Sequence, residues 1–128
     1  MKRAQLLTII ICSLLVLPVV LTGCGDKVKT YVDTGEIINT SVNDEFIIAL
    51  GYDLTHLWRE TYDESMLGLV ENMFDASPKV KRGEEEHGIA QYFRFKALKE
   101  GKTEITINKM TVDGQRIIVQ KVFNVNIE

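Results

Sequence analysis

Apolar and polar residues alternate with a period of two through most of the chain beyond residue 35. In the clearest run, Phe93, Phe95 and Ala97 alternate with Arg94 and Lys96. Similar runs occupy 45–50, 104–108 and 122–127. Successive side chains of a strand point to opposite faces, so this alternation predicts strands that each have one buried face.

Turn-forming residues separate these runs. The clusters lie at 42–44, 77–78, 99–102 and 112–115. Asp113-Gly114 is a hairpin signal, because both residues tolerate the positive φ of tight primed turns. Short strands separated by turns at roughly ten-residue intervals predict an all-β, antiparallel sandwich of about seven or eight strands.

The alternation also predicts which side chains form the core of the sandwich. We expect Trp58 to fill core space, because a tryptophan buries a large apolar area in such folds. Arg94 is expected on the solvent-facing side of its strand. The predicted core is Phe46, Ile48, Trp58, Leu69, Phe93, Phe95, Ile105, Ile107, Phe123 and Val125.

The N-terminal segment has the order of a bacterial lipoprotein signal peptide. Lys2 and Arg3 precede an apolar run, 6–20, and the tetrapeptide Leu21-Thr22-Gly23-Cys24. Charge, apolar run and small residues are the parts of a secretory signal, and the Leu-x-Gly-Cys ending resembles a lipobox. A membrane anchor and an ordinary signal are the alternatives, but a spanning helix needs roughly 20 apolar residues. We expect removal of 1–23 and lipidation of Cys24.

Lipidation predicts where the mature protein resides. A diacylglycerol on Cys24, with acyl chains such as palmitate, gives two membrane-binding chains, which hold a protein stably. The mature chain is therefore expected on the extracytoplasmic face of the cell membrane, with 24–34 as a polar tether and 35–128 as the folded domain. Cys12 leaves with the signal peptide, so the folded domain has no cysteine for a disulfide.

Charge excludes some classes of partner. The net charge of −3 becomes −5 when Lys2 and Arg3 are removed, which argues against nucleic-acid binding. The acidic run Glu84-Glu85-Glu86 is interpreted as a solvated loop, because loops that bind hard cations use spaced oxygens with turn glycines.

The sequence carries no catalytic signature. Ser41, Ser65 and Ser77 lie outside any nucleophile-elbow pattern. The two histidines, His56 and His87, are not in a pattern that identifies a nucleophile–base pair. Two histidines without a cysteine in the folded domain do not form a zinc motif. We therefore expect a protein that is not an enzyme and has no cofactor, no metal and no small-molecule substrate.

Several segments resemble the chagasin-like inhibitors of cysteine proteases. They are 43–50 followed by Trp58, then 62–70, 91–107 and 121–125. The resemblance implies an immunoglobulin-like sandwich. It also implies inhibition of papain-type peptidases by insertion of three loops into the active-site cleft.

The three loops depart from the family motifs. The family's first loop reads Asn-Pro-Thr-Thr-Gly, an aromatic residue, any residue and Trp, whereas here only Trp58 matches. Acidic residues interrupt the glycine-rich second loop, and the Arg-Pro-Trp of the third is absent after Lys109-Met110-Thr111. The resemblance implies weakened inhibition, with Tyr52 as the expected anchor. The loop residues it assigns are Gly51, Tyr52, Asp53, Leu54, Thr55, Gly83, Gly88, Asp113 and Gly114.

Two functions remain open. One is an inhibitor whose partner is a cysteine peptidase, which predicts three loops at one end of the fold with an exposed apolar tip. The other is a non-inhibitory module that engages another envelope protein, which predicts an exposed apolar patch on a sheet face or edge.

Overall fold

The computed structural model describes residues 28–128, so the signal peptide and Cys24 lie outside the described residues. No helix in this part of the chain is long and apolar enough to cross a membrane. The elements are β1 (Lys29–Tyr31), β2 (Ile38–Thr40), β3 (Glu45–Tyr52), β4 (His56–Tyr62), β5 (Leu67–Ala76), α2 (Pro78–Lys81), β6 (Ile89–Ala97), β7 (Gly101–Thr111) and β8 (Ile117–Ile127).

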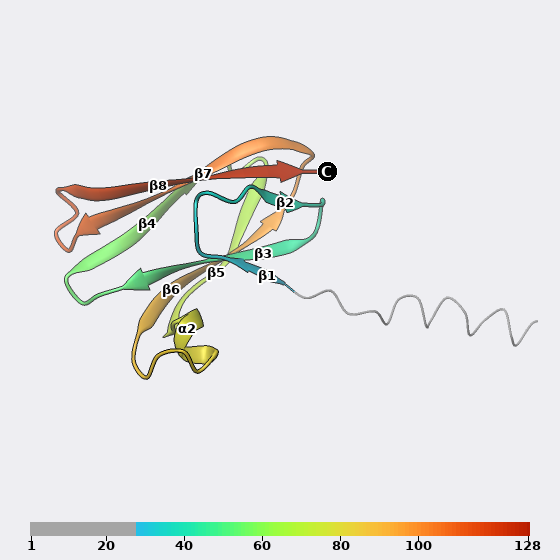
Figure 1. The fold of residues 1–128 in the computed structure, drawn as a ribbon. Coiled ribbons are helices and arrows are strands. Elements are labelled where there is room, and N and C mark those ends of the chain that lie inside the picture. The colour runs from blue at the N-terminus through green and yellow to red at the C-terminus, as the bar shows by residue number, and fades with distance from the viewer. Residues whose placement is uncertain (1–27) are drawn as a thin grey trace, which may run out of the picture.

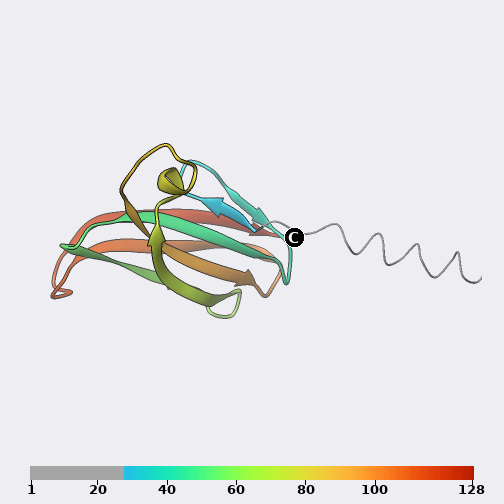
Figure 2. The same ribbon diagram turned by 90° about the horizontal axis from the view of Figure 1, so that it is seen from below.

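The strands form two facing sheets of four strands each (Figures 1 and 2). Sheet A has the order β1-β3-β6-β5, and sheet B has the order β2-β8-β7-β4. The core fills the space between them. The predicted all-β sandwich is confirmed.

Nine of the ten predicted core residues are buried, Trp58 among them. Leu69 is only partly buried and packs against the core cluster; it lies on β5, an edge strand of sheet A, beside the register shift at Leu69/Glu71. On the same strand, Leu67 is fully buried. Sequence alternation places Leu67 and Leu69 on one face but does not identify which of them is covered more completely.

The two shortest strands pair in parallel, unlike the rest of the sandwich. β1 runs alongside the start of β3, and β2 alongside the end of β8. Tyr31 and Ile38 anchor these strands in the core. Residues 24–34 were predicted to be a polar tether, but the fold already includes Lys29–Tyr31. The prediction is wrong there because three residues are too few to show an alternation.

Candidate functional site

The three loops singled out in the sequence start from the same end of the sandwich. They are the first loop (53–55) between β3 and β4, the second loop (77–88) between β5 and β6, and the third loop (112–116) between β7 and β8. Tyr52 pairs with Ile89, which brings the first and second loops together. His56 pairs with Thr111, which brings the first and third loops together. In Figure 1 this end lies opposite the C-terminus.

Asp53 organises the first loop. Its Oδ1 accepts hydrogen bonds from the Thr55 hydroxyl at 2.6 Å and from the Thr55 amide at 2.9 Å. The Nδ1 of His56 lies 3.1 Å from the same oxygen. The Lys109 ammonium lies 3.0 Å from Oδ2. A short polar side chain that bonds to the backbone two residues ahead holds a turn in place. These hydrogen bonds of Asp53 restrict the conformation of the first loop, which contains no proline.

Leu54 forms the tip that this turn presents. Its side chain is 85% exposed, the highest exposure among the large apolar residues of the described chain. Tyr52, the expected anchor, is half-buried, and its ring packs on Phe74 with centroids 4.6 Å apart. The structure thus gives Tyr52 a packing role and leaves Leu54 as the free apolar side chain.

We expect the first loop to keep its turn well into acid. The Thr55 hydroxyl, then the Lys109 ammonium and the Thr55 amide, hold the pKa of Asp53 far below its ordinary value of 3.8. A lowered folded-state pKa stabilises the turn above pH 3.8, and this stabilisation is lost only as the pH falls below that value toward the folded-state pKa. An NMR pH titration of the Thr55 amide checks this, with Asp53→Asn as the control that removes the titration. A midpoint near 3.8 would show that the carboxylate is not held by these donors.

The second loop folds back over the outer face of sheet A rather than extending beyond its end (Figure 2). Ser77 caps α2 by accepting a hydrogen bond from the Val80 amide. Gly83 ends the helix with φ 76°, and the Gly83 and Glu84 amides donate to the carbonyls of Val80 and Lys79. This pairing is a Schellman motif, which favours glycine at the left-handed position. Gly83 therefore terminates a helix that the sequence analysis did not predict.

Gly88 closes the second loop. Its carbonyl accepts a hydrogen bond from the Ser77 amide at 2.9 Å. Its φ is 155°, and a Cβ there would lie 3.0 Å from the Ser77 hydroxyl. Glu84, Glu85 and Glu86 are all exposed. The predicted solvated acidic loop is confirmed.

The third loop is a hairpin, as Asp113-Gly114 predicted. Asp113 Oδ1 accepts hydrogen bonds from the Thr111 hydroxyl at 2.5 Å and from the Gln115 amide at 3.0 Å. Gly114 has φ 74°, whereas Asp113 does not have a positive φ. The connection is therefore a turn followed by a left-handed glycine, and not the two-residue primed turn that was expected. Val112, 65% exposed, is the apolar residue at this tip.

Sequence reasoning missed the role of Lys109. Its ammonium forms an ion pair with Asp53 of the first loop and lies 5.7 Å from the centroid of the Trp58 ring. The Trp58 Nε1 donates a 2.7 Å hydrogen bond to the Gly51 carbonyl, which ties β4 to the end of β3. Only the β4–β7 register reveals this cluster, because Lys109 and Asp53 are far apart in the sequence.

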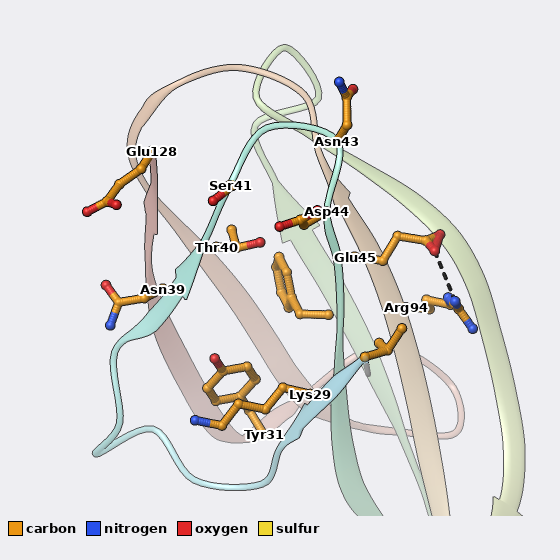
Figure 3. Close-up of a pocket in the computed structure, with 12 residues that line it drawn as sticks. Lys29, Tyr31, Asn39, Thr40, Ser41, Asn43, Asp44, Glu45, Arg94 and Glu128 are labelled. Atoms are coloured by element: carbon orange, nitrogen blue, oxygen red, sulfur yellow. Dashed lines mark hydrogen bonds and ion pairs between the residues drawn. The ribbon is translucent and has the colours of Figure 1, made fainter. Parts of the chain in front are cut away.

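A polar cavity of about 670 Å³ lies at the opposite end of the sandwich (Figure 3). It is lined by residues of β1, by the segment between β2 and β3, by Phe46 and by Glu128. Glu45 there pairs with Arg94 at 2.9 Å. Within residues 28–128, no three His, Cys, Asp or Glu side chains gather closely enough to hold a metal ion. The cavity is separate from the loop end.

Comparisons with known proteins bear on the fold. No protein-family model and no curated protein sequence matches the chain. Among solved structures, the cysteine protease inhibitor EhICP2 from Entamoeba histolytica is similar, with 20% identity and a TM-score of 0.59 over 81% of this chain and 100% of that one. Amebosin is similar with 12% identity and a TM-score of 0.54 over 80% of this chain and 100% of that one. The fold implied by the chagasin-like resemblance is thus confirmed.

Proposed function

We propose that this chain is a membrane-anchored, chagasin-like inhibitor of papain-type cysteine peptidases. The observation that carries the proposal is Leu54, an exposed apolar side chain on a turn whose hydrogen bonds hold it in place. A preorganised tip loses little conformational entropy when it enters a cleft. The fold shared with a cysteine protease inhibitor supports the same conclusion.

In this proposal the first loop makes the central contact and the third loop flanks it. Leu54 and Val112 supply apolar area from the two tips. The second loop contributes less, because it lies over sheet A. The protein inhibits by occupying the cleft and performs no chemistry of its own.

Titration of the purified protein against a panel of papain-type peptidases tests the proposal. We expect reversible inhibition that is competitive with substrate, and no inhibition of a serine peptidase with similar substrate preference. The absence of inhibition across the panel at high micromolar protein would reject the inhibitor function.

A second candidate is a non-inhibitory binding module that engages another envelope protein. Exposed apolar side chains away from the loop tips favour it, among them Val70 and Phe74 on β5. This candidate predicts no inhibition but stable capture of a membrane-associated partner.

The membrane anchor rests on the sequence of the leader. We expect Cys24→Ala to move the protein from the membrane fraction to the soluble fraction or to block removal of residues 1–23, because the acyl chains attach through that cysteine. Cell fractionation with mass determination of the N-terminus measures both effects. A membrane-bound variant with a mature N-terminus would rule out lipidation at Cys24.

A further inference from the structure

The first half of β8 has a free edge. β7 pairs with one side of β8 along its length, whereas β2 pairs with the other side only at Val125–Ile127. Within the described residues, no strand pairs with that second side at Ile117–Asn124. Free N–H and C=O groups along an edge can template another strand. A strand added there would lie on the same side of β8 as β2 does, next to the part of β8 that β2 leaves unpaired.

The free edge is apolar where it meets the third loop. Ile117, Ile118 and Val119 are 57%, 49% and 40% exposed. Ile118 is an extra residue opposite the Lys109–Met110 step of β7, which makes a bulge. A bulge disturbs the ladder locally. The regular part of the free edge is therefore Val119–Asn124, with apolar contact area beside it.

Positive charges flank this apolar run in an otherwise acidic chain. Arg116 precedes the run and Lys121 follows it, and neither forms an ion pair with another residue of 28–128. The Lys121 ammonium lies 5.9 Å from the centroid of the Trp58 ring. A groove of about 520 Å³ beside the end of β3 includes Trp58, Lys109 and Lys121 in its lining.

We propose that the free edge of β8 binds an extended, acidic segment of a partner protein by strand addition. Backbone hydrogen bonds to β8 would hold the segment, and a carboxylate of the segment would meet Lys121 beside Trp58. Charge complementarity selects this occupant over a second copy of the chain. Pairing two β8 edges would bring both copies of Arg116 and Lys121 to one seam, where like charges repel.

Peptide binding to the purified full chain tests the inference. The probe is a blocked heptapeptide, Thr-Val-Glu-Val-Thr-Val-Glu, and the matched control has lysine in place of both glutamates. Trp58 is the only tryptophan of the chain, so its fluorescence reports occupancy of the neighbouring groove. We expect a saturable change with the glutamate peptide and at least tenfold weaker binding of the lysine peptide.

Variants and modified peptides separate strand addition from simple charge attraction. Lys121→Glu should reverse the preference for the glutamate peptide, and Lys121→Gln should abolish that preference. Lys102→Glu makes the same charge change at the far end of β7 and should leave the preference unchanged. In a peptide paired with β8, alternate amides point toward β8 and the others point away from it. N-methylation of the first set should abolish binding, whereas N-methylation of the second set should not. Equal binding of both N-methylated peptides, or no binding of the glutamate peptide at millimolar concentration, would overturn the proposal. Concentration-dependent dimerisation that Lys121→Glu weakens would assign the edge to a second copy instead.

Discussion

Replacing Phe95 with alanine is expected to lower the free energy of unfolding by about 3–5 kcal/mol. Phe95 is fully buried on β6, an inner strand of sheet A. Its ring stacks on Phe46 at 5.7 Å and meets the edge of Tyr62 at 5.1 Å. The variant loses the transfer free energy of the ring and leaves a cavity between the two sheets. Urea unfolding followed by Trp58 fluorescence measures the change.

Arg94→Ala is the matched control on the same strand. Arg94 was expected to be solvent-facing, and the structure shows a half-buried side chain paired with Glu45. Such a pair contributes at most about 1 kcal/mol, so the loss should be several times smaller than for Phe95→Ala. Equal losses for the two variants would mean that the faces of β6 are reversed.

Replacing Leu54 with alanine should weaken inhibition of a sensitive papain-type peptidase by about thirtyfold. Truncating a binding anchor costs about 2 kcal/mol or more, which corresponds to that factor. Leu54 is expected to act as the anchor because it is the most exposed large apolar side chain of the described residues and sits on a fixed turn. The inhibition constant of each variant measures the effect.

Val70→Ala is the control for Leu54→Ala, because it also truncates an exposed aliphatic side chain, 52% exposed and midway along β5. It should leave the inhibition constant unchanged. Since neither side chain is buried, both variants should unfold at nearly the same denaturant concentration as the native chain. Inhibition that survives Leu54→Ala would keep the activity and remove the first loop from its centre.

Much of the sandwich follows from the sequence, because period-two alternation is strong where one face of a strand is covered. Phe93 and Phe95 illustrate this. β1 and β2 have three residues each and show no period, and α2 is too short to show a helical period. The signals for α2 were nevertheless present, since Ser77-Pro78 and Gly83 are residues that start and stop helices.

The loop end was predictable only in outline. The hairpin at Asp113-Gly114 and the order of the three loops follow from turn residues and topology. The geometry of the first loop does not, because it depends on Lys109 reaching Asp53 from another strand. The packing of Tyr52 on Phe74 depends on β3 and β5 both flanking β6, which no local pattern reveals.

The pairing of β2 with β8 sets the order in which the domain can assemble. Asn126 Nδ2 donates a 3.4 Å hydrogen bond to Asn39 Oδ1 across 87 positions of sequence. Pairing such distant residues carries the entropic cost of closing a long loop, and sandwiches rich in such pairings fold in about milliseconds to seconds. Sheet B cannot be completed before β8 (Ile117–Ile127) takes its place between β2 and β7. Loss or delay of β8 would therefore leave both β2 and β7 without the neighbour that joins them in sheet B.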